Sequence, residues 1–381
     1  MDNKKYIVKL LREGSINEVD WEGDFSDTQA KCVTPQSLAD DMNKELGRLN
    51  LASKDRDKRG TKDVIYTRNQ MEKNLTADGE LDVAKFKKLI TTPPKTIFDQ
   101  NPKMEKSDDG GEQMTVNTGL PAINGIIYDN DNGKFYHINT CPGAGSCQLI
   151  CYARKGFYGM NDGKVLKLIR RLNLLMNDPT EYYNMIMDEL EPLAFKLKRQ
   201  GRRSGSVPKL VMRWNDAGDF FSQKYFDIAV KVTKDLFDAG FDVKSYAYTK
   251  QAKFVNLASD DFIMNFSKGS APKELRQVDL ETTKYSDVIP KKLFKGLFYP
   301  KANSYKKDED GLPIFVDGGK EELRRRVAKE YDIDINRLKY HKELPSTEGE
   351  KFQYDVIVLP TGDTDISAQR QDVHKTFLAI H

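Results

Sequence analysis

The sequence lacks long apolar runs, and this argues against a protein that crosses a membrane. None of its stretches approaches the roughly 20 consecutive apolar residues that a membrane-spanning helix needs. The first residues, MDNKKYIVKLLREGS, are charged throughout and contain neither the apolar core nor the cleavage site of a signal peptide. We therefore expect a cytoplasmic protein with no membrane partner.

The sequence also lacks a strong charge of one sign. Its 61 basic and 58 acidic residues leave a formal net charge of +3, so overall electrostatics argue neither for nor against a nucleic-acid partner. Two local runs are basic, at residues 196–209 and 320–329. A solvated helix end and a solvated helix face are the favoured interpretation, and a phosphate-binding patch is the alternative.

Several familiar catalytic signatures are missing. The chain contains no P-loop, no dinucleotide-binding glycine fingerprint, no zinc-protease helix and no nucleophile elbow. Its four cysteines do not indicate a disulfide framework in a cytoplasmic protein. Three of them nevertheless lie within eleven positions, which indicates metal binding, cluster binding or redox chemistry.

The composition changes along the chain. Residues 1–115 are rich in Lys, Asp, Asn and Glu, and amphipathic spacing predicts helices at 34–49 and 80–90, followed by a linker at 91–113. Residues 116–381 alternate between predicted strands and helices. We therefore predict an α/β protein in two parts, a mainly helical N-terminal extension and a partial or irregular (β/α) barrel.

The elements of the second part follow from local signals. A hairpin is expected around the turn Asp-Asn-Gly that ends at Gly133. Asp178 and Ser222 are expected to cap helices, and Pro192 is expected to kink or end one. Further predicted strands are 208–216, 241–250, 261–269, 295–300, 337–343 and 354–360, with a helix at 319–331.

Cys141, Cys147 and Cys151 follow the spacing C-x5-C-x3-C on a glycine-rich loop. Gly143 and Gly145 let the backbone fold tightly, so three thiolates can converge on one side of a metal centre. Iron–sulfur clusters normally take four cysteine thiolates, and structural zinc sites usually include a C-x2-C pair, which is absent here. The pattern therefore favours an iron–sulfur cluster over zinc.

The fourth ligand of such a centre is not obvious from the sequence. Cys32 lies about 110 residues upstream of the loop, and His137 lies on the strand that leads into it. Either residue can complete a structural site. If neither residue does, one iron of the cluster stays open to a small molecule, and this is the form of cluster that can bind a ligand and take part in a reaction.

Polar residues also end two later strands. Arg213 and Trp214 alternate on their strand, so one of them is expected to face the inside of the barrel and the other the helices. An inward Arg213 can hold an anionic substrate or a cofactor carboxylate, and the alternative for Arg213 is a salt bridge. Asn215 can add a hydrogen bond at the same strand end, and Tyr248 ends the next strand. An ordinary turn and an aromatic core position are the alternatives.

A cysteine loop after the first strand of a partial barrel resembles the radical S-adenosylmethionine enzymes, whose commonest pattern is C-x3-C-x2-C. A closer resemblance is to the phage family called gene product 88. The matching segments occur in order, and they are CPGAGSCQLICYARKGFYG, LIRRLNLLMNDPTEYYNMIMDEL, VMRWNDAGDFF and SYAYTK. The resemblance covers residues of about 120 to 270 well and does not cover the N-terminal part.

This resemblance implies a phage-encoded 4Fe–4S protein in the host cell, with S-adenosylmethionine as a second cofactor. Gly218 and Asp219 then correspond to the motif that contacts the amino group of that cofactor. The substrate, a small molecule or a nucleic acid, is not indicated. The alternative is a non-catalytic cluster protein, structural or redox-sensing, that binds nucleic acid or a host protein partner.

Overall fold

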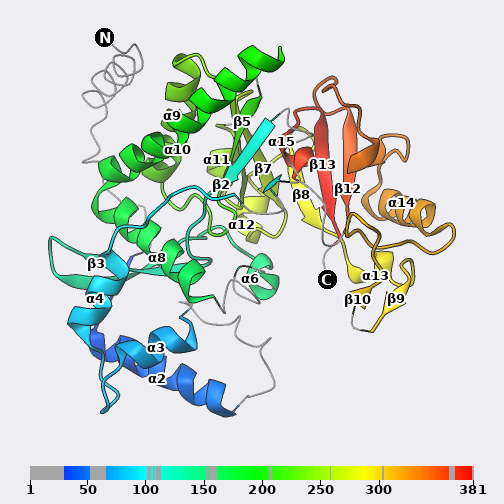
Figure 1. Cartoon of the computed structure of the whole chain (residues 1–381). Coiled ribbons are helices and arrows are strands. Elements are labelled where there is room, and N and C mark those ends of the chain that lie inside the picture. Colours follow the sequence, from blue (N-terminus) through cyan, green and yellow to red (C-terminus); the bar gives the residue numbers. More distant parts are fainter. Residues whose placement is uncertain are drawn as a thin grey trace, which may run out of the picture. The chain divides into compact units, whose positions relative to one another are not determined.

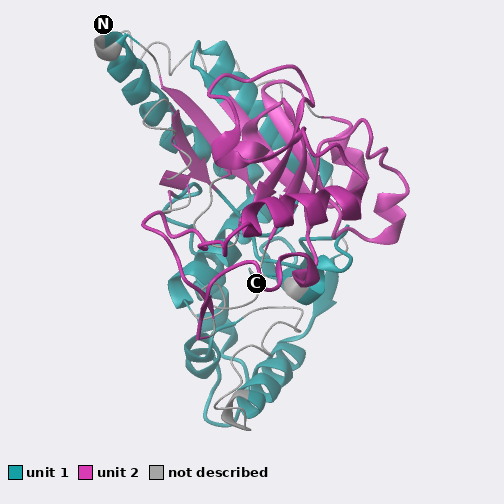
Figure 2. Ribbon diagram, turned by 90° about the vertical axis from the view of Figure 1, so that its right-hand side faces the viewer, with its two compact units in different colours: residues 1–99, 118–207, 215–243 teal, residues 100–117, 208–214, 244–381 magenta. Residues whose placement is uncertain are grey.

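The structure is a computed structural model, and it describes residues 30–51, 66–100, 104–105, 108, 113–151, 153, 161–205, 208–257, 259–302, 304–359 and 365–379. The expectations for the first residues of the chain lie outside this set. The chain divides into two compact units (Figure 2). Unit 1 comprises residues 1–99, 118–207 and 215–243, and unit 2 comprises residues 100–117, 208–214 and 244–381. The predicted boundary near residue 115 stays a prediction.

Unit 1 contains a small antiparallel sheet with the strand order β1–β4–β3, and Figure 1 labels its strand β3. Its strands are β1 (Lys31–Val33), β3 (Asn124–Asp129) and β4 (Lys134–Asn139). The β3–β4 pair is the predicted hairpin, and its turn is held by Asp129, whose carboxylate accepts a hydrogen bond from the Asp131 amide at 2.9 Å. The strand β4 leads directly into the cysteine loop.

Unit 1 also contains helices. They are α2 (Pro35–Leu51), α3 (Arg68–Asn74), α4 (Val83–Thr91), α6 (Cys147–Ile150), α8 (Asp162–Asn177), α9 (Pro179–Ser204) and α10 (Gln223–Asp238). Of these helices, α4 and α8 contact the strand β3. Leu38 of α2, Phe86 of α4 and Ile169 of α8 bury their side chains in one core with Ile126 and Phe135 of the hairpin. The described part of the N-terminal region is therefore mainly helical and packs on the hairpin.

Side-chain oxygens begin the long helices of unit 1. Asn161 caps α8, and the predicted caps Asp178 and Ser222 begin α9 and α10, where each accepts a hydrogen bond from a backbone amide three residues later. Of the two alternatives expected at Pro192, a kink or the end of the helix, the end is contradicted, because α9 continues to Ser204. The missing amide of a proline removes one hydrogen bond, and packing along a 26-residue helix outweighs that loss.

Unit 2 is built on an eight-stranded sheet with the order β11–β12–β13–β8–β7–β6–β5–β2. Its strands are β2 (Gln113–Asn117), β5 (Lys209–Trp214), β6 (Val243–Thr249), β7 (Phe262–Ser267), β8 (Tyr285–Val288), β11 (Leu338–Tyr340), β12 (Tyr354–Val358) and β13 (Val373–Leu378). The pairs β2–β5, β6–β7, β7–β8, β8–β13, β13–β12 and β12–β11 are all parallel. The predicted α/β class with a large parallel sheet is confirmed.

The order of the strands changes direction at β8. From β2 to β8 neighbouring strands follow the chain order, whereas β13, β12 and β11 follow it in reverse. Shorter elements of unit 2 connect the strands. They are α11 (Ala252–Val255), α12 (Pro272–Leu275), α13 (Lys291–Phe294), β9 (Pro300–Lys301), β10 (Ser304–Tyr305), α14 (Gly319–Tyr331), the 3-10 helix η4 (His341–Glu343) and α15 (Ile366–Gln369).

Opposite faces of this sheet carry different helices. On one face, α13 and α14 bury Phe294, Leu323 and Val327 against Ile357 and Phe377. On the other face, Ala368 of α15 packs against Val211, Tyr246 and Ile263. The Asn265 amide fixes α15 there, because it donates a hydrogen bond to the Ala368 carbonyl at 3.1 Å.

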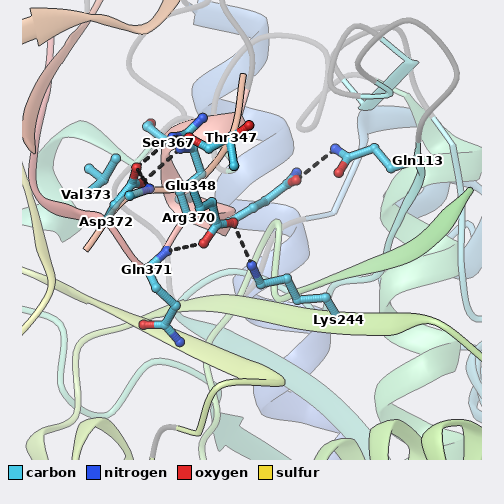
Figure 3. A network of polar contacts seen from close by, with 12 residues as sticks. Gln113, Lys244, Thr347, Glu348, Ser367, Arg370, Gln371, Asp372 and Val373 are labelled. Atoms are coloured by element: carbon cyan, nitrogen blue, oxygen red, sulfur yellow. Dashed lines mark hydrogen bonds and ion pairs between the residues drawn. The ribbon is translucent and has the colours of Figure 1, made fainter. Parts of the chain in front are cut away.

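A polar network holds the chain around α15 at the amino ends of the strands (Figure 3). Arg370 forms an ion pair with Asp372 at 2.6 Å and donates to the Pro345 carbonyl at 2.5 Å. Glu348 receives hydrogen bonds from the Lys244 ammonium at 2.9 Å and the Gln371 amide at 3.1 Å. These contacts connect the segment before β13 to the loop before β12 and to the start of β6.

Sequence patterns missed three strands of the sheet and misplaced one. The predicted strand at 295–300 is wrong, because these residues follow α13 and reach only the small β9–β10 hairpin. The missed strands β2, β8 and β13 carry polar residues at buried positions, such as Thr115, Ser286 and Thr376. Alternation of polar and apolar residues does not identify a strand that is buried on both faces. No helix in the described part of the chain combines the length and apolar character needed to span a membrane.

Candidate functional site

The cysteine loop follows β4 in unit 1. Cys141 comes two residues after the strand ends and is 6% exposed, and its carbonyl accepts a hydrogen bond from the Ala144 amide at 3.0 Å. Cys147 opens α6 and Cys151 follows its last residue, and both are partly buried. Cys151 therefore follows Cys147 by four residues, which is about one helical turn along the chain.

The segment Gly119–Ile123 anchors the start of this loop. The Thr140 amide donates to the Ile123 carbonyl at 2.8 Å, and the Thr140 hydroxyl donates to the Pro121 carbonyl at 2.5 Å. The Ile123 amide points at the Cys141 sulfur at 3.4 Å. Cys141 is therefore held by backbone contacts as well as by apolar packing against Ile123 and Ala144.

The same segment also holds the turn Asn215–Asp219. The Asp216 amide donates to the Thr118 carbonyl and the Leu120 amide donates to the Ala217 carbonyl, both at 2.9 Å. Ala217 is buried in a small cluster with Ala122, Ala153 and Leu168, and Cys151 packs against this cluster. Two motifs that lie about 70 residues apart in the sequence are thus brought together in unit 1.

The turn has an unusual backbone. Asn215 has a φ of 58°, in the left-handed region that side chains other than glycine rarely adopt, and Gly218 has a φ of 80°. Gly119 approaches the turn so closely that a Cβ atom there would lie 2.2 Å from an Asp216 carboxylate oxygen. Backbone strain of this kind concentrates at functional sites, where the surrounding structure has to hold it.

Two polar side chains of the turn are buried. The side-chain oxygen of Asn215 accepts a hydrogen bond from the Tyr225 hydroxyl at 2.9 Å. The side-chain nitrogen of Asn215 has no hydrogen-bond partner among the described residues. The Asp219 carboxylate accepts a hydrogen bond from the Phe220 amide at 2.8 Å. A buried amide without a partner costs free energy, so the turn offers a donor for a bound group.

A lysine that the sequence patterns did not single out also reaches the turn. The Lys164 ammonium on α8 lies 4.0 Å from the Asp216 carboxylate, and Leu168, one helical turn later, packs in the cluster with Ala217. The sequence alone shows that Lys164 and Leu168 lie one helical turn apart, but only the tertiary structure shows that both lie beside the turn Asn215–Asp219.

The two candidates for a fourth cluster ligand lie on the hairpin sheet. Cys32 is exposed on β1 and pairs with Tyr136, three residues before β4 ends. At about 3.3 Å per residue, roughly 10 Å of strand separates it from the start of the loop. His137 lies on β4 opposite Lys31 and Ile126.

The donor set suits an iron–sulfur cluster chemically, because three thiols lie in one glycine-rich loop and two are held beside Ala122 and Ile123. The positions of these thiols in the structure do not suit a cluster. Within the described residues, no three Cys, His, Asp or Glu side chains lie close enough to hold a metal ion. A cluster bound by the three cysteines therefore requires the loop 142–150 to move.

Arg213 and Tyr248, the other predicted binding residues, belong to unit 2. The Arg213 guanidinium forms a buried ion pair with Asp365, and it lies 5.6 Å from the centre of the Tyr248 ring. The Tyr246 hydroxyl donates to the same Asp365 carboxylate at 3.1 Å. Burial raises the pKa of Tyr246 well above its ordinary value, and Asp365 adds to the rise. The salt bridge considered for Arg213 is present.

These observations define a mixed α/β protein with a parallel sheet in one unit and a three-cysteine loop in the other. Comparison with family models finds Gene product 88 over residues 95–328, which is more than half of the 381-residue chain. The protein belongs to this phage gene product family. No curated protein and no solved structure matches the chain.

Proposed function

We propose that this member of the gene product 88 family is an iron–sulfur protein in which Cys141, Cys147 and Cys151 bind a 4Fe–4S cluster. The supporting observation is the segment Gly119–Ile123, which contacts Cys141 directly and shares an apolar cluster with Cys151. The third thiol, Cys147, is one helical turn from Cys151. The proposal places the protein in the host cytoplasm, where thiols stay reduced.

The second part of the proposal concerns S-adenosylmethionine. A reduced cluster with one iron open to this cofactor supplies one-electron chemistry. The turn Asn215–Asp219 supplies groups for an amino-acid moiety: a carboxylate such as Asp219 pairs with an ammonium, and the Asn215 amide nitrogen can donate to a carboxylate. Gly218 lets the backbone approach closely. The substrate is an unidentified small molecule or nucleic acid.

The fold proposal is a partial, irregular (β/α) barrel. The strands β2, β5, β6, β7 and β8 follow one another in chain order, as barrel strands do, and this supports the proposal. The strands β13, β12 and β11 follow in the reverse of the chain order, which a regular barrel does not show. Such a reversal is typical of open doubly wound sheets, so these three strands form the irregular part of the proposed barrel. An experimental structure that shows a flat, open sheet throughout would contradict the barrel.

Anaerobic reconstitution with iron and sulfide tests the cluster. We expect about four irons per chain and the visible charge-transfer absorption of a thiolate-bound cluster. Cys141→Ala, Cys147→Ala and Cys151→Ala should each lose most of the iron. Cys32→Ala is the matched control, since Cys32 is exposed on β1, and it should retain the iron.

Titration with S-adenosylmethionine tests the second part. The reduced cluster should change its EPR spectrum when the cofactor is added, and Asp219→Asn should weaken that response. A spectrum indifferent to the cofactor would leave a non-catalytic cluster protein. Loss of iron in Cys32→Ala would favour a structural site, and stoichiometric zinc without iron would refute both versions.

A further inference from the structure

A lysine-rich stretch of unit 2 differs from the basic runs discussed above. Residues 288–307 contain six lysines and no acidic residue. The lysines are Lys291, Lys292, Lys295, Lys301, Lys306 and Lys307, and all are exposed. They lie on α13, on the β9–β10 hairpin and on the residues that follow these elements (Figure 1).

The hairpin has an apolar inner face and a mixed outer face. Phe298 packs on Tyr305 and Phe315 with ring centroids 4.9 and 4.7 Å apart, in the core that α13 and α14 also enter. Neighbouring residues of an extended chain point to opposite sides, so Tyr299 and Ile314 point outward, and each is 38% exposed. An aromatic ring therefore stands on the outer face, away from the core.

Two lysines share the outer face of the hairpin with this ring. The Lys306 amide donates to the Tyr299 carbonyl at 2.9 Å, which pairs the two residues across the hairpin. The Lys306 ammonium lies 5.7 Å from the centre of the Tyr299 ring. Lys301 is two residues from Tyr299 and pairs with Ser304. We call Tyr299, Lys301 and Lys306 the hairpin surface.

Most of these lysines have no acidic side chain among the described residues as a direct partner, and three acidic residues, Asp308, Glu309 and Asp310, follow directly after Lys307. Lys292 forms an ion pair with Glu330 at 2.8 Å, but within the described residues no acidic side chain pairs with Lys291, Lys295, Lys301, Lys306 or Lys307. The Asp308 carboxylate accepts from the Leu312 amide at 2.8 Å, and Asp310 forms an ion pair with Lys342 at 2.5 Å.

The arginines of α14 behave differently. Arg325 lies 3.1 Å from Glu322, and Arg326 lies 2.8 Å from the same carboxylate. Arg324 is paired with Glu321 at 2.9 Å and with Glu343 at 2.6 Å. Each arginine of the basic run at 320–329 therefore has a glutamate partner, unlike most lysines of the 288–307 stretch.

We propose that the hairpin surface, with the lysines of α13 and Lys307 around it, binds single-stranded nucleic acid. Lysines without a direct acidic partner attract the phosphates, and an exposed tyrosine offers a stacking platform for an unpaired base. A duplex keeps its bases stacked on each other and cannot use this platform. An anionic membrane would use the lysines but would not depend on stacking.

Fluorescence anisotropy with a labelled 20-nucleotide oligo(dT) tests the surface. At 50 mM NaCl we expect a Kd on the order of 10⁻⁶–10⁻⁵ M, with affinity falling linearly in log[salt]. The double substitution of Lys301 and Lys306 by alanine should lower the magnitude of the slope of log affinity against log[salt] by about 1.4, which is about 0.7 per lost phosphate contact. Tyr299→Ala should weaken binding about 5- to 150-fold without changing the slope.

The matched control is Arg325→Ala on α14, which removes an exposed but paired positive charge and should change Kd less than twofold. Melting curves followed by circular dichroism should show that all variants remain folded, since every replaced side chain is exposed or at the surface. The proposal is refuted by no binding at 100 µM protein. It is also refuted by Tyr299→Ala binding as tightly as wild type, by equal affinity for the duplex, or by binding only to phosphatidylserine vesicles.

Discussion

Replacing Lys284 with methionine is expected to remove a pH dependence from the stability of this protein. Lys284 precedes β8 and is 5% exposed. Its ammonium donates three hydrogen bonds, to the carbonyls of Ser367 at 2.9 Å, Arg370 at 3.0 Å and Val373 at 2.6 Å. These three residues belong to the segment around α15, which the network in Figure 3 fastens to the sheet.

Burial lowers the pKa of Lys284 from 10.5 to about 7, although the carboxylates of Asp372 and Glu348 oppose the shift. Lys244 and Arg370 add a smaller lowering. One pKa unit corresponds to about 1.4 kcal/mol, so keeping the charge in this site costs about 5 kcal/mol relative to the neutral amine. The three carbonyl oxygens act in the opposite direction, because they favour the ammonium.

The direction of the pH effect follows from the lowered pKa. Between pH 7 and 10.5 the unfolded chain binds more protons than the folded chain, so the free energy of unfolding rises with pH. Below pH 7 both states are protonated and the full cost remains. Between pH 7 and 9 we expect the stability of wild type to gain about 2 kcal/mol relative to Lys284→Met.

Urea unfolding at pH 7, 8 and 9 measures this difference. Lys291→Met is the matched control, because it removes an exposed lysine of the same unit, and its difference from wild type should stay constant. The 13Cε resonance of Lys284 should titrate in the same range. A flat difference for Lys284→Met would refute the burial argument and would mean that the three carbonyls keep the ammonium at its ordinary pKa.

Two other predictions concern contacts that hold the candidate residues. Asp365→Asn should destabilise the fold by about 3–5 kcal/mol in chemical denaturation, because it leaves the Arg213 charge buried without its partner, and Arg213→Met with Asp365→Leu should recover most of the loss. An Asp365→Asn variant as stable as wild type would contradict this. Gly119→Ala should cost about 1–3 kcal/mol, since its Cβ would meet Asp216. Gly47 lies in α2, and a Cβ atom there would meet no other atom within 4 Å, so Gly47→Ala should instead stabilise the fold by about 0.5–1 kcal/mol. Equal effects of Gly119→Ala and Gly47→Ala on stability would refute the close approach of Gly119 to Asp216.

Much of the fold could be predicted because its signals are local. The caps at Asp178 and Ser222, the hairpin that ends in the cysteine loop, and the helix α14 all depend on side chains a few residues apart. The strands β8 and β13 could not be predicted in the same way. Both strands are buried in the parallel sheet although they carry polar residues such as Ser286 and Thr376, and local alternation of polar and apolar residues does not reveal such burial.

The candidate site was predictable only in part. The cysteine spacing and the turn at Asn215 could be read as motifs, but the contact between them runs through Gly119–Ile123, which carries no recognisable signature. Arg213 could be read as a strand-end cation. Its partner Asp365 lies 152 residues further along the chain, and only folding brings the two together.

The sequence by itself therefore determined the α/β class, the family membership and the three-thiol loop, since each depends on residue types at short spacing. Tertiary structure decided which charges have a direct partner and which do not. It pairs the arginines of α14 with glutamates, and within the described residues it leaves the lysines around Tyr299 without acidic partners. Compensation of charge depends on distances in space, and spacing along the chain specifies those distances only within a helix or a hairpin.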